Sequence, residues 1–169
     1  MQAAQTEGAE LTPRDIDALF QETDRVYREA ARGCGVADSA YWILYDIVMA
    51  GGAETLAQVT DNNSLSRQTA SSSVRALERR GLVTLEFVEG SRRDKLVRLT
   101  DAGRAFCERS IAPAMRAEAR AFAALPPGDR RDLVRIIRTY VAGLDRELGL
   151  LRRELDAAGE SQTLEVGAL

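Results

Sequence analysis

The sequence predicts a mainly α-helical protein with one small β-hairpin, and three observations lead to this fold class. Apolar residues recur at three- and four-residue steps through most of the 169 positions, which is the spacing of amphipathic helices. The stretch from Leu82 to Leu99 is instead rich in β-forming residues on both sides of a turn at Glu89, Gly90 and Ser91. A long apolar seam near the C-terminus requires a helical partner.

The first helix begins at a clear capping signal. Thr12, Pro13 and Asp15 supply an N-cap, a proline in the first turn and an acid near the positive end of the helix dipole. Apolar residues then follow at helical spacing to about Arg32, before a glycine-containing break. Residues 1–11 carry no periodic pattern, and we expect them to be disordered.

Two further helices precede the hairpin region. The second begins at Asp38 or Ser39 and is apolar nearly all round as far as Ala50, which predicts burial on most sides. The third is expected from Ala53 to about Asp61. It forms the first half of a helix-turn-helix whose turn spans residues 62–65.

The fourth helix combines a buried stripe with a polar face. Ser66 is a good N-cap and Gly81 a good C-terminal stop. Ala70, Val74 and Leu77 recur at helical spacing and face the core. The opposite side holds short polar, glutamine and arginine side chains, which suit a helix in the major groove of DNA. A plain hydrated helix face is the alternative.

The hairpin that follows favours the DNA interpretation. Its tip carries Arg92 and Arg93, with Lys95 close behind, where cations reach phosphates or the adjacent minor groove. Residues 66–104 hold nine basic and five acidic side chains, a local net charge of +4, although the whole chain has a net charge of −3. Local charge decides whether a face attracts phosphates. The order of helix and hairpin is that of a winged helix-turn-helix.

The segment from Ser66 to Thr100 resembles the MarR family of bacterial regulators. The resemblance rests on LERRGLV from Leu77, on Arg93 before a Leu-Thr pair in the hairpin, and on TDAGRAF from Thr100. It is good over about forty residues, and the order of helices extends it to nearly the whole chain. The sequence departs from the family where Ser91 replaces an aspartate, Ser73 replaces a bulky apolar residue, and Asn63 and Ser64 replace an apolar residue and a glycine.

The resemblance implies a dimeric, sequence-specific DNA-binding regulator, a repressor, that a small molecule releases from double-stranded DNA. Two-fold symmetry then requires a pseudo-palindromic operator. The side chains that we expect to read bases are Gln68, Ser71, Ser72 and Arg75. Those that we expect at phosphates or the minor groove are Ser66, Arg67, Arg79, Arg92, Arg93 and Lys95.

The C-terminal third predicts two more helices. The first runs from Thr100 and Asp101 to about Phe122, with a bend or break at Pro113. After a turn at residues 126–128, the last helix carries an apolar seam with steps of 4, 3, 4, 4, 3 and 4 residues, at Leu133, Ile137, Tyr140, Leu144, Leu148, Leu151 and Leu155. Packing on helices of its own chain is one use for this near-heptad seam. Its length favours a second copy, that is, a homodimer.

The chain therefore divides into five segments. They are a disordered N-terminus (1–11), an N-terminal dimerisation helix (12–35), a winged helix-turn-helix lobe (36–100), C-terminal dimerisation helices (101–156) and a flexible tail (157–169).

Composition excludes several classes of function. The chain has no histidine, which removes Ser-His-Asp and Cys-His catalysis and nearly every zinc site. No glycine-rich loop has the spacing that cradles phosphates. We expect no enzymatic activity, no metal and no cofactor. With no run of about 18 apolar residues and no basic-then-apolar N-terminus, we expect a cytoplasmic protein without a membrane segment.

Two features point to regulatory inputs. In relatives, aromatic ligands bind between the dimerisation helices and the DNA-binding lobe, so the resemblance implies an effector pocket at Phe20, Tyr27, Tyr41, Trp42 and Tyr45. The alternative is that these rings are core. Cys34 lies between glycines and near Arg32, a setting that can lower the pKa of a thiol and make it redox-active, but inert packing is the favoured interpretation. A winged-helix protein-interaction module that no longer binds DNA is the competing function.

Overall fold

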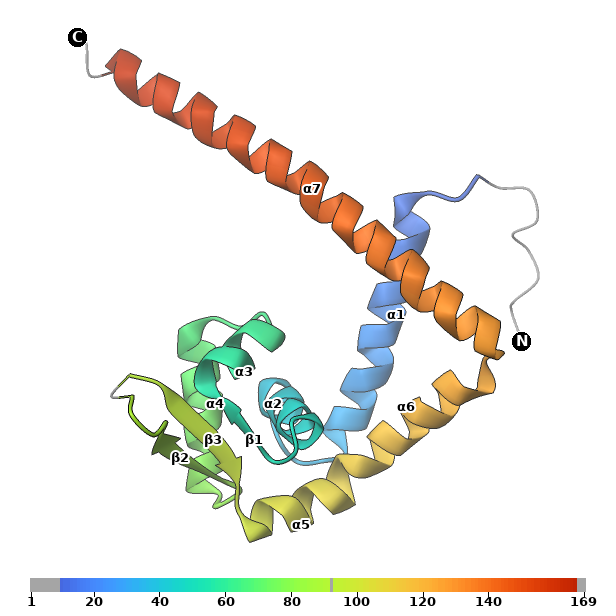
Figure 1. The fold of residues 1–169 in the computed structure, drawn as a ribbon, viewed down its shortest axis with the longest axis vertical. Coiled ribbons are helices and arrows are strands. Elements are labelled where there is room, and N and C mark those ends of the chain that lie inside the picture. The colour runs from blue at the N-terminus through green and yellow to red at the C-terminus, as the bar shows by residue number, and fades with distance from the viewer. Residues whose placement is uncertain (1–9, 92, 167–169) are drawn as a thin grey trace. The chain divides into compact units, whose positions relative to one another are not determined.

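The computed structural model describes the backbone of residues 10–91 and 93–166, and the side chains as far as residue 157. The chain divides at Ala117 and Glu118 into two compact units. Among the described helices, none combines the length and apolarity needed to cross a membrane. In chain order the elements are α1 (Pro13–Arg32), α2 (Asp38–Met49), β1 (Ala53–Thr55), α3 (Leu56–Asn62), α4 (Arg67–Arg79), β2 (Val83–Phe87), β3 (Lys95–Leu99), α5 (Asp101–Ser110), α6 (Ala112–Ala124) and α7 (Pro127–Val166), as Figure 1 shows.

The sheet confirms the predicted hairpin and adds a strand to it. β2 and β3 pair antiparallel from Val83 opposite Leu99 to Phe87 opposite Lys95. β1 pairs with the other edge of β3, which gives the order β1-β3-β2. The result is a mainly α-helical winged helix with a small antiparallel sheet, the fold class that the sequence predicts.

The prediction of a helix from Ala53 was wrong for its first three residues. They form strand β1, antiparallel to β3, and α3 begins at Leu56. The hydroxyl of Thr55 accepts a hydrogen bond from the Gln58 N–H and caps the helix there. Pairing with a strand some forty residues away therefore overrides local helix propensity before Thr55.

Helix α2 supplies the centre of the core, as its all-round apolar pattern predicts. Its residues Tyr41, Ile43, Leu44 and Ile47 are fully buried. Around them pack the apolar faces of the other elements of the first unit. The fully buried side chains from those elements include Val59, Val74, Leu77, Val83, Val97 and Ile111.

The expected break near Pro113 is present, two residues before the proline. Helix α5 ends at Ser110, and α6 begins at Ala112. Pro113 has no N–H to continue the hydrogen-bond ladder of α5, and its ring disfavours a helical conformation just before it. The break at Ile111 therefore has a local cause in the sequence.

Helix α7 is longer than predicted at both ends. It begins at Pro127, so Pro127 and Gly128 lie in its first turn rather than in the preceding loop. Proline fits the first helical position because its missing N–H has no partner there in any case. The helix continues to Val166, although we predicted a flexible tail from residue 157. A single glycine at position 159 costs only about 1 kcal/mol in a helix and does not end it.

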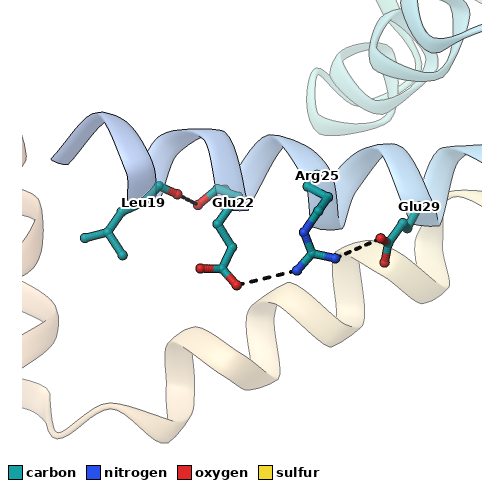
Figure 2. Close-up of polar contacts among 5 residues, drawn as sticks. Leu19, Glu22, Arg25 and Glu29 are labelled. Atoms are coloured by element: carbon teal, nitrogen blue, oxygen red, sulfur yellow. Dashed lines mark hydrogen bonds and ion pairs between the residues drawn. The ribbon is translucent and has the colours of Figure 1, made fainter. Parts of the chain in front are cut away.

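Helix α1 is stabilised by interactions within itself. Figure 2 shows the Arg25 guanidinium between Glu22, at 3.5 Å, and Glu29, at 2.8 Å. Exposed pairs at this spacing contribute about 0.3–0.5 kcal/mol each. At the start of the helix, the Thr12 N–H and hydroxyl both donate to the Asp15 carboxylate, which lowers the pKa of Asp15.

Gly103 in α5 marks a close approach of two backbones. A Cβ atom at this position would overlap the carbonyl of Leu82, which precedes β2. The Thr100 N–H donates to the same carbonyl at 3.1 Å, so the contact fixes where α5 leaves the sheet. Only glycine fits here without moving one of the two chains.

We predict that Gly103→Ala lowers the free energy of unfolding by about 2 kcal/mol or more, because overpacking against backbone finds little room to relax. Gly33→Ala is the matched control: its Cβ would meet only ordinary van der Waals contact at 3.6 Å, and its effect should stay within about 0.5 kcal/mol. Urea denaturation of both variants measures the difference. Equal stabilities would contradict the close contact.

Candidate nucleic-acid interface

Helix α4 is held so that one face must point outward. The Ser66 hydroxyl accepts a hydrogen bond from the Thr69 N–H at its start, and Gly81 has a left-handed φ of 70° just past its end. The stripe predicted from the sequence is buried: Ala70, Val74 and Leu77 are at most 1% exposed. The opposite face lines a hollow of about 380 Å³, formed by Gln68, Ser71, Ser72, Arg75 and Arg79.

The long side chains of this face are not used by the fold. Within the described part of the chain, Gln68, Arg75 and Arg79 make no hydrogen bond or ion pair. Arg80 behaves differently. Its guanidinium donates to the Gly35 carbonyl at 2.9 Å and lies 5.5 Å from the centre of the Phe106 ring. Arg80 therefore has a structural role, whereas the adjacent Arg79 is available to a ligand.

The wing tip is organised by Ser91. Its hydroxyl donates to the Asp94 carboxylate at 2.9 Å and lies within 3.2 Å of the N–H groups of Arg93 and Asp94, which donate to it. Gly90 supplies the left-handed φ of 78° in the turn. The serine that replaces the family's aspartate therefore still closes the turn, and Arg93 is exposed. Arg92 lies outside the described residues.

A second hollow, of about 860 Å³, brings together cations that are distant in the sequence. Arg67 from α4 and Arg93 and Lys95 from the wing line it, together with Ser71 of α4 and with residues of the α3 region, namely Thr55, Leu56, Ala57, Thr60 and Asp61. Asp61 and Asp94 also face it, so its charge is only modestly positive. Three of the predicted phosphate contacts, Arg67, Arg93 and Lys95, thus share one groove, whereas Arg79 lines the first hollow.

The turn between α3 and α4 is held by two asparagines that the sequence analysis did not identify as structural. The Asn63 amide donates to the Asp46 carboxylate at 2.7 Å and to the Val59 carbonyl at 2.9 Å. The Asn62 amide donates to Glu54 at 2.6 Å. Next to them, Ser64 adopts a positive φ of 49°, the conformation for which the family uses glycine. No sequence pattern signals these pairs, because their partners lie on α2 and β1.

Comparison with known proteins places this geometry in a family. Residues 35–94, which contain the helix-turn-helix and most of the wing, match the MarR family. This segment is therefore similar to the MarR family, and its observed fold is a winged helix. No curated protein sequence gives a significant match to the chain.

Solved structures of bacterial regulatory proteins share the fold across most of the chain. A MarR family regulator from Neisseria meningitidis is 18% identical and has a TM-score of 0.70, with 82% of this chain and 98% of that one covered. BpsR from Bordetella bronchiseptica is 20% identical, with a TM-score of 0.60 and coverage of 81% and 97%. PcaV from Streptomyces coelicolor, solved with its natural ligand, is 21% identical, with a TM-score of 0.58 and coverage of 79% and 97%.

Four of the five expected effector-pocket residues, Tyr27 from α1 and Tyr41, Trp42 and Tyr45 from α2, come together in the first unit. Trp42 lies at the centre of the group, with ring centroids 4.9 Å from Tyr27, 5.5 Å from Tyr41 and 5.6 Å from Tyr45. Tyr41 is fully buried and belongs to the core. Phe20 is 44% exposed on α1. The aromatic set is therefore part core and part surface, and only Tyr27, Trp42 and Tyr45 remain half-exposed at its edge.

The surroundings of Cys34 agree with the favoured interpretation of an inert, packed thiol. Burial raises the pKa of this thiol, which disfavours the reactive thiolate. Its sulfur lies 3.0 Å from the Ser110 carbonyl, to which the thiol donates. Burial also raises the pKa of Cys107 to about 11. Both thiols therefore fit structural roles.

Two partly buried carboxylates lie beside the helix-turn-helix turn. Glu54 is 7% exposed, and its Oε2 atom has no hydrogen-bond partner among the described residues. Burial raises the pKa of Glu54, and the nearby charge of Asp46 raises it further, against the opposing hydrogen bond from Asn62. Burial likewise raises the pKa of Asp46, which the Asn63 hydrogen bond partly offsets. The ionised pair is thus a source of instability next to the turn.

We predict that Glu54→Gln stabilises the protein at neutral pH. A carboxyl group whose folded pKa exceeds its unfolded value, about 4.3 for glutamate, weakens the fold as pH rises through the folded pKa. The glutamine removes this charge and keeps an oxygen for Asn62. Thermal unfolding across a pH series should show a gain at pH 7 that disappears near pH 4. Glu89→Gln, at an exposed position, is the control, and an equal gain there would contradict the assignment.

Proposed function

We propose that this protein is a dimeric, sequence-specific DNA-binding transcriptional regulator, a repressor. The observation that carries the proposal is the outward face of α4. It presents Gln68, Arg75 and Arg79 without internal partners, beside a groove that gathers Arg67, Arg93 and Lys95. Unpaired hydrogen-bonding groups on an exposed helix, next to cations on a hairpin, match the needs of a major groove flanked by phosphates.

The roles of the side chains follow from their positions. The N-terminal and central part of α4, with Gln68, Ser71, Ser72 and Arg75, reads base edges. Ser66, Arg67 and Arg79, together with Arg93, Lys95 and the undescribed Arg92, contact phosphates or the minor groove. The competing function is a protein-interaction module that does not bind DNA. It does not account for the unpaired arginines of α4 and the wing.

The proposed homodimer uses the terminal helices. In a single chain, the seam residues Leu133, Ile137, Leu144, Leu148 and Leu151 of α7 are each 40–47% exposed. Helix α1 also exposes large apolar side chains, with Leu19 at 61% and Val26 at 53%. Apolar surface of this extent marks an interaction site. A two-fold pair would present two reading helices about 34–36 Å apart, the spacing of successive major grooves.

The proposed input is a small aromatic molecule bound at the edge of the Tyr27, Trp42 and Tyr45 group. Two comparisons support this part of the proposal: the DNA binding of BpsR is regulated by 6-hydroxynicotinic acid, and PcaV was solved with its natural ligand. Binding would act by population shift, because a ligand that prefers one spacing of the two reading helices lowers affinity for the operator by its differential binding energy.

We predict that DNA binding is steeply salt-dependent and that Arg93→Ala weakens it for every sequence. Each lost phosphate contact should reduce the slope of log affinity against log salt by about one. Fluorescence anisotropy with duplexes from the gene's upstream region measures both quantities. Arg109→Ala, on the exposed surface of α5, removes the same charge away from the proposed interface and should change neither. Absence of salt-dependent binding to any duplex would favour the interaction module.

We also predict that the double variant Leu144→Glu, Leu148→Glu is monomeric. Two charges in an apolar seam cannot be buried without a large cost, whereas the wild type should be a dimer by multi-angle light scattering. Arg146→Gln is the control. It also makes each α7 helix more negative, but on the face opposite the seam, and it should leave the dimer intact. A monomeric wild type, or a dimeric double variant, would overturn the proposed assembly.

A further inference from the structure

The reading face of α4 carries two side chains that can specify a base by paired hydrogen bonds. They are Gln68 and Arg75, both exposed and without partners in the described chain. Arg67 lines the other hollow, with the wing. Arg79 lies in the last turn of the helix, whereas the N-terminal part of a recognition helix is the part that meets base edges. Base identity therefore depends mainly on Gln68 and Arg75.

The two side chains lie on one line along the helix. They are seven residues apart, which is nearly two full turns, so they share the face that forms the hollow lined by both. Seven residues correspond to a rise of about 10.5 Å. Base pairs in a duplex stack at about 3.4 Å, so the two side chains reach bases about three pairs apart.

The positions between them carry only short hydroxyls. Ser71 is half-buried, and the Ser72 hydroxyl already donates to the Thr69 carbonyl at 2.9 Å. A serine hydroxyl can both donate and accept, and it contacts several bases without choosing sharply among them. The middle of each half-site is therefore read weakly, and discrimination falls on its two ends.

We propose that each half of the operator carries a guanine and an adenine about three base pairs apart, with Arg75 on the guanine and Gln68 on the adenine. Arginine donates two parallel hydrogen bonds to guanine O6 and N7. Glutamine accepts from adenine N6 and donates to N7. The inference rests on the proposed function, because it names the DNA sequence that the same face recognises.

Selection from a random duplex library tests the inference with full-length wild type, Arg75→Ala and Gln68→Ala at one salt concentration. The wild type should enrich half-sites with both bases at the stated spacing. Arg75→Ala should lose the preference for guanine and retain adenine, and Gln68→Ala should do the reverse. Each variant should bind the wild-type consensus about tenfold more weakly or worse. Because both side chains are exposed and unpartnered, thermal melts of the variants should match the wild type.

The control is Arg93→Ala, which should bind all duplexes less tightly and select the same consensus. Two kinds of failure are distinguishable. If the wild type enriches no sequence, the proposed function itself is wrong. If it enriches a consensus that lacks the guanine and adenine at this spacing, or if either α4 variant selects the wild-type consensus, the inference is wrong and DNA binding stands.

Discussion

The burial of one stripe of α4 against the core of the first unit constrains the rest of the interface. Ala70, Val74 and Leu77 are removed from water, and each large apolar side chain buried in this way contributes about 1.5–3 kcal/mol. Rotation of the helix would expose the stripe, so its opposite face has no freedom to turn inward. The placement of Gln68 and Arg75 toward solvent is therefore a consequence of packing.

The parts of the winged-helix lobe that depart from the MarR family pattern are held by other chemistry. Ser91 closes the wing turn through hydrogen bonds to Asp94 and the local N–H groups. Asn63 replaces an apolar residue of the turn, yet it ties the end of α3 to α2 through Asp46. A buried polar group of this kind stabilises a structure only while its partner is present. Polar groups beside this turn can also destabilise the fold. Burial raises the pKa of the Glu54 carboxyl, because its charged form is poorly solvated there.

Local patterns in the sequence sufficed for the features that depend on neighbours in the chain. The stripe and caps of α4, the hairpin turn at Gly90 and the break before Pro113 were all predicted, because each follows from residues within one or two turns. The features that were missed depend on distant partners. β1 forms because β3 is beside it, and the Cys34 thiol is packed against the end of α5. The polar face of α4 follows from the local pattern. The contacts of Arg80 with Gly35 and Phe106, which leave Arg79 as the unpaired one of these two arginines, depend on distant parts of the chain.

The seam of α7 has a period that bears on how two copies would pair. Its six steps from Leu133 to Leu155 cover 22 residues, an average of about 3.7 per step, close to the period of an 11-residue repeat. A strict heptad imposes a left-handed supercoil, whereas a period of about 3.67 imposes a slight right-handed one. Helix α7, of 40 residues, spans about 60 Å. In the proposed dimer, two such helices would therefore wrap around each other only slightly, which keeps the apolar seams in contact along their length.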